Sequence, residues 1–169
     1  MIRLLIKLLY GGFDCRGLNK KNILVMAFFQ KMLRVNANVP WPVHWASRVD
    51  APEKIQRGTR VPGYMPGCYF DGRNGIIIGE NVLFGPNVNV ISMNHDLCDF
   101  NDYSTAKPIV IGKNSWIGAG CTILPGVELG EHTIVGAGSV VTKSFVEPDQ
   151  VIAGNPACVV KKISSYREL

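Results

Sequence analysis

By residue type and position, His95 is the residue of this chain best suited to catalysis. It stands in the stretch VISMNHDL, residues 90–97. The chain repeats with a period of six residues on both sides of this stretch, and the repeat stops here. A neutral imidazole near pH 7 is the usual general base for removing a proton from an attacking hydroxyl. We therefore predict that His95 is a general base placed at a break in a regular structure.

An imidazole that acts as a base usually needs a hydrogen-bond acceptor that fixes its tautomer. Four aspartates are candidates for that acceptor: Asp71, Asp96, Asp99 and Asp102. Asp96 is adjacent to His95, but neighbouring side chains on a strand point to opposite faces. The sequence does not choose among the four carboxylates.

The other two histidines are interpreted as structural. His132 lies in GEHTI at a turn and is expected to be exposed to solvent. His44 lies in VPWPVHW, beside Trp41 and Trp45, which could stack on a sugar ring but are better interpreted as a plug beneath the N-terminal segment. The three histidines are 51 and 37 residues apart, so a clustered three-histidine zinc site is not predicted.

The elements that must position His95 are visible as the six-residue repeat. The first residue of each block is small or aliphatic: Ile76, Val82, Val88, Ile109, Ser115, Cys121, Val127, Thr133 and Ser139. The third is mostly aliphatic: Ile78, Phe84, Val90, Ile111, Ile117, Ile123, Leu129, Val135 and Val141. Both positions share one side of a strand and are predicted to point inward. One short strand per block, with coils stacked about 4.8 Å apart, builds a solenoid of parallel strands.

Glycine often follows the third position, and we interpret it as the residue that permits the turn after each strand. These glycines are Gly79, Gly85, Gly112, Gly118, Gly130, Gly136 and Gly154. After Val88 the next inward position should be Asn94, and the next recognisable one is Ile109, 15 residues later. Because 15 is not a multiple of six, residues 95–108 are predicted to leave the coil as a loop. Loops on rigid scaffolds often carry function.

The repeat resembles that of the hexapeptide-repeat acyltransferases, in particular the maltose, galactoside and capsular-polysaccharide O-acetyltransferase branch. The segments that carry the resemblance are NGIIIGENVLFGPNVNVISMNHD, IVIGKNSWIGAGCTILPGVELGEHTIVGAGSVVTKSF and VIAGNPACVVKKI. It implies an all-β chain folded as a left-handed parallel β-helix of triangular cross-section. We expect an N-terminal helical cap at 1–38, the β-helix domain at 39–163 with an extruded loop at 95–108, and a C-terminal tail at 164–169.

The same resemblance implies transfer of an acetyl group from acetyl-CoA to a hydroxyl of a sugar or glycan intermediate, with no metal required. The catalytic histidine of the family lies in the matching NHD-type segment, which is His95 here, oriented by a carboxylate or a backbone carbonyl. The oxyanion donor is expected to be a backbone amide near Gly118 or Ala119. The candidates for orienting the substrate or contacting the acceptor are Asn94, Asp96, Asp71, Asn87, Tyr64, Tyr69 and Tyr103.

Three segments look like the CoA groove of the family: SWIGAG, TIVGAGSVVTKS and GNPACVVKK. The residues expected to lie along the pantetheine arm are Trp116, Gly118, Ala119, Gly136, Ala137 and Gly138. Lys143, Lys161 and Lys162 are candidates for the CoA phosphates, and the alternative for each is a solvated surface charge. The family is trimeric with active sites between neighbours, so a cyclic homotrimer is expected.

Composition limits the other functions. The chain has 169 residues and a net charge of +5, but no RNA-binding aromatic signature and no zinc-finger spacing, so nucleic-acid binding is not predicted. Five cysteines without a CxxC pair indicate a reducing compartment, and we predict the cytoplasm.

The N-terminus, MIRLLIKLLYGGF, is not expected to be a signal peptide, because Lys7 interrupts the apolar run and no cleavage site follows. Arg3 and Lys7 share one face of a predicted helix. Four more basic residues flank a second amphipathic stretch: Lys20, Lys21, Lys31 and Arg34. Two interpretations stay open: helices that pack on the domain or a partner subunit, and a helix that lies on the inner surface of the membrane.

Alternative functions stay open on the sequence alone. The acceptor could instead be an amino sugar, serine or an antibiotic hydroxyl. Serine acetyltransferases, however, have a longer N-terminal domain than the one expected here. A zinc carbonic anhydrase on the same kind of β-helix needs clustered histidines, which this chain lacks. A non-catalytic scaffold is disfavoured by the presence of His95 and the CoA-like segments.

Overall fold

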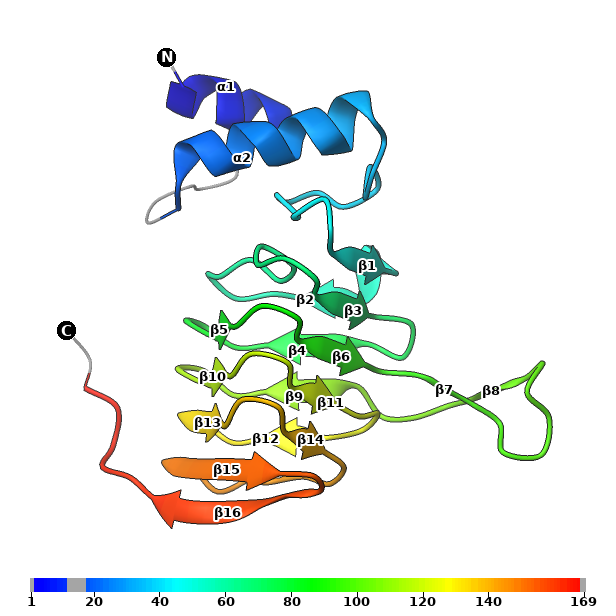
Figure 1. The fold of residues 1–169 in the computed structure, drawn as a ribbon, viewed down its shortest axis with the longest axis vertical. Coiled ribbons are helices and arrows are strands. Elements are labelled where there is room, and N and C mark those ends of the chain that lie inside the picture. The colour runs from blue at the N-terminus through cyan, green and yellow to red at the C-terminus, as the bar shows by residue number, and fades with distance from the viewer. Residues whose placement is uncertain (1, 12–17, 168–169) are drawn as a thin grey trace.

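The chain winds into a solenoid of short parallel strands, with two helices at its N-terminal end and a hairpin projecting from one side (Figure 1). The computed structural model describes residues 2–11 and 18–167. Three sheets run along the solenoid, and each full coil passes from sheet 1 to sheet 2 to sheet 3. The predicted solenoid of parallel strands is confirmed.

The strands of each sheet come from successive coils. Sheet 1 contains β1 (Arg48–Asp50), β3 (Tyr69–Asp71), β6 (Asn89–Ile91), β11 (Thr122–Ile123) and β14 (Val140–Val141). Sheet 2 contains β2 (Ile55–Gln56), β4 (Ile76–Ile78), β9 (Ile109–Ile111) and β12 (Glu128–Leu129). Sheet 3 contains β5 (Leu83–Phe84), β10 (Trp116–Ile117), β13 (Thr133–Val135), β15 (Gln150–Gly154) and β16 (Ala157–Lys162). Within these sheets only β15 and β16 pair antiparallel. We name the corners of the solenoid by the sheets they join: 1–2, 2–3 and 3–1.

Inward side chains stack from coil to coil. In sheet 1, Val90 is in register with Phe70 on one side and with Ile123 on the other. All three are completely buried. The first and third repeat positions are buried throughout, except for Phe84, which is half-buried and meets Phe70 edge-on at 5.1 Å. Full burial of such a side chain contributes about 1.5–3 kcal/mol, so each coil stabilises its neighbours through one continuous core.

The repeated glycines are required by the close approach of neighbouring coils. Of the seven, only Gly154 has a positive φ. A Cβ placed on Gly79 would lie 2.6 Å from the backbone nitrogen of Lys113 in the next coil. The left-handed conformations at corner 2–3 belong instead to residues such as Asn81 and Asn114, a residue type that tolerates them. The expectation that these glycines supply backbone freedom is therefore wrong for all of them except Gly154. At positions such as Gly79, glycine is required because the backbones of successive coils nearly touch.

Replacing Gly79 by alanine is expected to lower the free energy of unfolding by about 1–3 kcal/mol, the usual cost of overpacking. Gly79 does not have a positive φ, so alanine can adopt its backbone conformation. Without the steric contact, Gly79→Ala would therefore be neutral or stabilising. Denaturant unfolding followed by circular dichroism measures the change. Gly120→Asn is the matched control, since Gly120 has φ +68° and open space around it. A Gly79→Ala variant as stable as the parent would contradict the steric explanation.

The N-terminal part is helical. Helix α1 covers Ile2–Leu9, and α2 covers Lys20–Ala27 and continues as a π-helical turn, η1, over Phe28–Met32. A short 3-10 turn, η2 (Pro52–Lys54), joins β1 to β2. These helices fall inside the cap expected over residues 1–38, whose boundary as a separate domain stays a prediction.

Buried Gln30 fixes the helices to the first coil. Its side-chain oxygen accepts hydrogen bonds from the Tyr10 hydroxyl at 2.7 Å and the Val43 backbone N–H at 3.1 Å. Its amide nitrogen donates to the backbone carbonyl of Trp41 at 3.0 Å. The indole of Trp41 is itself buried, as a plug would be. Trp45, by contrast, is exposed and stacks on Phe29 with ring centroids 4.7 Å apart.

After β16 the chain returns along corner 2–3. The Asn81 side-chain amide donates to the Tyr166 hydroxyl oxygen at 2.9 Å, and the Tyr166 ring meets His132 edge-on. His132 Nδ1 lies 2.8 Å from Asp149 Oδ1, and only 16% of the His132 side chain is exposed. This contact lowers the pKa of the Asp149 carboxyl. The expectation that His132 is solvent-exposed is therefore wrong, because the returning tail and Asp149 cover it.

Candidate functional site

The hairpin at corner 1–2 carries His95. It consists of β7 (Asn94–His95) and β8 (Tyr103–Ser104), which pair antiparallel with His95 opposite Tyr103. The hairpin projects well beyond the solenoid (Figure 1).

The coil stops slightly earlier than the repeat predicts. Ser92 is completely buried, whereas Asn94, the expected inward position, is exposed on β7. The coil resumes at Ile109, as predicted. The extruded segment predicted over residues 95–108 is therefore present, and it begins just after Ser92, because β7 already pairs with β8 instead of with the stack.

A backbone carbonyl orients the imidazole of His95. Nδ1 lies 2.7 Å from the carbonyl oxygen of Phe100. A carbonyl can only accept a hydrogen bond, so Nδ1 carries a proton, and in the neutral form of the ring Nε2 holds the lone pair. The ring lies against Tyr103 with centroids 4.7 Å apart, and the His95 side chain is exposed to solvent. An exposed imidazole whose neutral form has a fixed tautomer is the arrangement a general base needs.

The aspartates of the loop have another use. Asp96 Oδ1 accepts the backbone N–H of Cys98 at 2.7 Å, and Asp99 Oδ1 accepts that of Asn101 at 2.9 Å. Asp102 Oδ1 accepts the N–H of Tyr103 at 2.8 Å. These bonds to nearby backbone groups are typical of aspartates in turns. They shape the loop that presents the Phe100 carbonyl to the imidazole.

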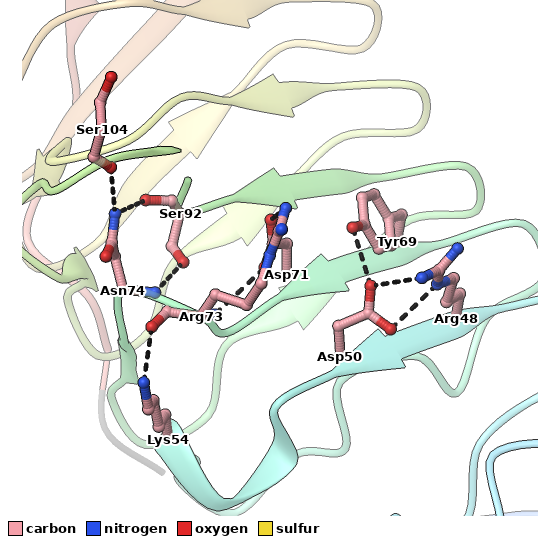
Figure 2. A network of polar contacts seen from close by, with 9 residues as sticks. All are labelled: Arg48, Asp50, Lys54, Tyr69, Asp71, Arg73, Asn74, Ser92 and Ser104. Carbon is pink, nitrogen blue, oxygen red and sulfur yellow. Dashed lines mark hydrogen bonds and ion pairs between the residues drawn. The ribbon is translucent and has the colours of Figure 1, made fainter. Parts of the chain in front are cut away.

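One asparagine clamps the two ends of the hairpin. The Asn74 side-chain amide donates to the backbone carbonyls of Ser92 at 3.0 Å and Ser104 at 3.1 Å, as Figure 2 shows. The Asn74 backbone N–H donates to Ser92 Oγ at 2.8 Å. The sequence alone does not point to Asn74, because its partners lie 18 and 30 residues away and two of the three bonds use backbone carbonyls.

Asp71 and Arg73 form an ion pair beside the hairpin (Figure 2). Arg73 Nε lies 2.9 Å from Asp71 Oδ1, and Nη2 lies 2.8 Å from Oδ2. The Asp71 side chain is 1% exposed and the Arg73 side chain 37%. The hydrogen bond to Asp71 raises the pKa of Arg73. The guanidinium also lies 4.8 Å from the ring centroid of Tyr103, which packs on His95.

Asp71, a candidate to orient His95, thus reaches it only through Arg73 and Tyr103. The sequence analysis does not predict the role of Arg73 beside the hairpin. The available signal was an acidic and a basic residue two positions apart at the end of an apolar strand.

Tyr69 belongs to a separate contact on sheet 1. Its hydroxyl donates to Asp50 Oδ2 at 2.9 Å, and Arg48 lies 3.0 Å from the same carboxylate (Figure 2). Burial, followed by the bond to Asp50, raises the pKa of Tyr69 to about 12. Tyr69 is therefore a neutral hydroxyl on the strand that leads to Asp71.

The small residues expected along CoA gather at corner 3–1. They occupy the turns after β10 and β13: Gly118, Ala119, Gly136, Ala137 and Gly138. The turns are bonded to each other, since the Gly138 N–H donates to the Ala119 carbonyl at 2.8 Å. Asn87 lies in the preceding coil at this same corner, with φ +58°, and not on the hairpin with His95.

The other predicted CoA residues are spread over the solenoid. Trp116 is 54% exposed on sheet 3 and, with Leu83 and Tyr166, lines a hollow of about 210 Å³. Lys143 is at corner 1–2, with Nζ 5.7 Å from the Phe145 ring centroid. Lys161 and Lys162 are on β16, where Lys162 Nζ donates to the Pro148 carbonyl at 3.3 Å. One chain alone therefore does not gather all these residues in one place. Across the residues described, no group of three or more His, Cys, Asp or Glu side chains could hold a metal ion.

Comparison with known proteins identifies the family. The bacterial transferase hexapeptide (six repeats) model matches residues 108–143. A Staphylococcus aureus protein named "Putative acetyltransferase" is 35% identical over 151 residues, covering 87% of this chain and 72% of that protein. The chain belongs to the hexapeptide-repeat acyltransferase family. The predicted family is confirmed.

Two further relatives of this hexapeptide-repeat chain are named for sugar acetylation. The galactoside O-acetyltransferase of Lactococcus lactis is 40% identical over 90 residues, which is 52% of this chain and 42% of that protein. The crystal structure of a maltose O-acetyltransferase from Clostridium difficile 630 has a TM-score of 0.58 and 34% identity, covering 70% of this chain and 64% of that one. This likeness supports the predicted left-handed β-helix class. The chain thus matches less than half the length of relatives such as the L. lactis enzyme.

Proposed function

We propose that this protein is an acetyl-CoA-dependent O-acetyltransferase that acts on a hydroxyl of a sugar or glycan intermediate. The observation that carries the proposal is the geometry of His95, whose Nδ1 is bound to the Phe100 carbonyl while the residue as a whole is exposed to solvent. Membership of the hexapeptide-repeat family and the sugar O-acetyltransferases among its relatives support the choice of reaction.

In the proposed reaction His95 moves one proton. Nε2 takes the proton of the acceptor hydroxyl while its oxygen attacks the thioester carbonyl carbon. The carbonyl oxygen gains negative charge, which a backbone N–H near Gly118 or Ala119 stabilises. The carbon–sulfur bond then breaks, and the CoA sulfur takes the proton from Nε2. The products are the acetyl ester and CoA, and His95 returns to its starting tautomer.

We place this site between two chains of a homotrimer. His95 is at corner 1–2, whereas the small residues expected along CoA are at corner 3–1, so a strand of sheet 1 separates them within each coil. A neighbouring chain in a cyclic assembly can bring its corner 3–1 to the hairpin. The proposed compartment is the reducing cytoplasm. In line with that, the buried thiols of Cys68 and Cys121 are unpaired, and burial raises the pKa of both.

Calorimetric titration with acetyl-CoA tests the proposal without knowledge of the acceptor. We expect micromolar binding, about −8 kcal/mol, that weakens in Lys143→Ala, because the ammonium group contacts a CoA phosphate. Lys113→Ala is the matched control, since Lys113 at corner 2–3 pairs with Glu131 at 3.4 Å. A folded protein, with its oligomer intact, that binds no acetyl-CoA at millimolar concentration would rule out the proposed reaction. It would favour a non-catalytic scaffold. An acceptor screen with galactosides, maltose and amino sugars then separates the acceptor classes.

A further inference from the structure

The positive charge of the chain is concentrated at one end. Residues 1–38 contain seven Lys or Arg and a single acidic residue, Asp14, which gives a net charge of +6. Residues 39–169 contain eleven Lys or Arg and twelve Asp or Glu, which gives −1. The excess of +5 therefore comes wholly from the helical segment. Such asymmetry within one chain is typical of contact with a membrane or a polyanion.

Helix α1 exposes a row of leucines to solvent. Ile6 is fully buried and Tyr10 is 5% exposed, so this side of the helix packs on the protein. Leu4, Leu5 and Leu8 are 68%, 48% and 80% exposed. Residues three and four apart lie on one face of a helix, so these leucines form a single apolar ridge on the side away from Ile6.

The segment formed by α2 and η1 repeats this arrangement. Val25, Phe28 and Met32 are exposed by 43%, 52% and 71% and follow each other at spacings of three and four. On the opposite side, Met26 and Gln30 are buried. The two helices lie next to each other at the end of the solenoid opposite β16 (Figure 1). This end therefore presents two apolar ridges to solvent.

Basic side chains accompany both ridges. Lys7 on α1, Lys21 on α2 and Lys31 on η1 are exposed, and Arg34 follows η1 in solvent. The other two arginines of the segment, Arg3 and Arg16, lie where side chains are not described. Leucine and phenylalanine ridges bordered by lysine and arginine are the pattern of helices that lie in the interface of an anionic bilayer.

We propose that the helical cap, residues 2–11 with 18–34, binds the surface of an anionic lipid bilayer. The exposed leucines, phenylalanine and methionine enter the boundary between headgroups and acyl chains, and the lysines and arginine contact the headgroup phosphates. A second copy of the same end fits less well, since two such faces would bring two charges of +6 together. None of the helices in the described part of the chain has the length and apolar character of a membrane span.

Co-sedimentation of the full chain with vesicles tests the proposal. Vesicles of phosphatidylcholine with about 30% phosphatidylglycerol are compared with phosphatidylcholine alone at low and high salt. We expect binding to the anionic vesicles that is at least about tenfold stronger than to the neutral ones and that weakens with salt. Equal binding to both kinds of vesicle, or none to the anionic vesicles by folded protein, would overturn the proposal.

Two variants locate the contact. Leu8→Asp and Met32→Asp change exposed side chains, and each should weaken binding about tenfold or more by removing apolar area and adding a negative charge. Val160→Asp is the matched control, because Val160 is 61% exposed on β16 at the opposite end. Thermal unfolding by circular dichroism verifies that each variant folds. Unchanged vesicle binding of the two cap variants would refute the proposal. So would variants whose only effect is a change of oligomeric state.

Discussion

His95→Ala is expected to reduce turnover at least about 100-fold, within the usual range for loss of a general base. Acetyl-CoA affinity should change little, because in the proposed reaction the imidazole acts on the acceptor hydroxyl and not on the CoA. Release of the CoA thiol with a galactoside or maltose acceptor measures turnover, and calorimetry measures binding. A loss of turnover with unchanged affinity indicates an interaction made in the transition state.

His132→Ala is the control for this experiment. His132 is also a histidine bonded through Nδ1, but its partner is Asp149 and it lies at corner 2–3. Its replacement should leave turnover near that of the parent at neutral pH. Turnover of His95→Ala within a few-fold of the parent would exclude His95 as the base.

Arg73→Met is expected to lower both stability and turnover. It leaves the Asp71 carboxylate, which is 1% exposed, without its cation. Breaking a fully buried pair in this way costs about 3–5 kcal/mol. Because the Arg73 side chain is 37% exposed, we expect about 2–3 kcal/mol here. Loss of the guanidinium over Tyr103 also frees the ring that packs on His95, so turnover should fall at least about tenfold. The KM for acetyl-CoA should be unchanged.

Asp71→Asn combined with Arg73→Met separates the two effects. The asparagine removes the buried charge but keeps an oxygen that can accept the backbone N–H of residue 73, as Asp71 Oδ1 does at 3.1 Å. The double variant should therefore recover much of the stability, as measured by denaturant unfolding. Its turnover should stay low, because the guanidinium is still missing. Full recovery of turnover with stability would show that Arg73 has no positioning role.

The coil of this protein could be predicted from its sequence because its signal is local and repeated. Inward positions such as Val90 and Ile123 recur every six residues, and the same pattern carries the family resemblance. The role of glycine differs from the predicted one, because the contact that excludes a side chain at Gly79 comes from Lys113, in another coil. A single coil read alone does not contain that neighbour.

The site could be predicted only in part. The residue type and the break in the repeat both indicated His95, but its partner is the backbone carbonyl of Phe100, and any amino acid at position 100 would offer the same oxygen. The long-range contacts of Asn74 and the position of Arg73 over the Tyr103 ring depend on how the base of the hairpin meets corner 1–2. Such pairings have no periodicity and leave no pattern in one sequence.

The two hydrogen bonds of the Asn74 side chain separate the hairpin structurally from the coils. Because one amide holds the carbonyls of Ser92 and Ser104 together, the segment between them begins and ends at nearly the same point on the solenoid. Lengthening a flexible loop whose ends are already held costs little, about 0.6 kcal/mol for each doubling of its length. The coils above and below need no adjustment when such a segment is exchanged. This surface segment can therefore change in length and sequence while the stacked core that carries it stays the same.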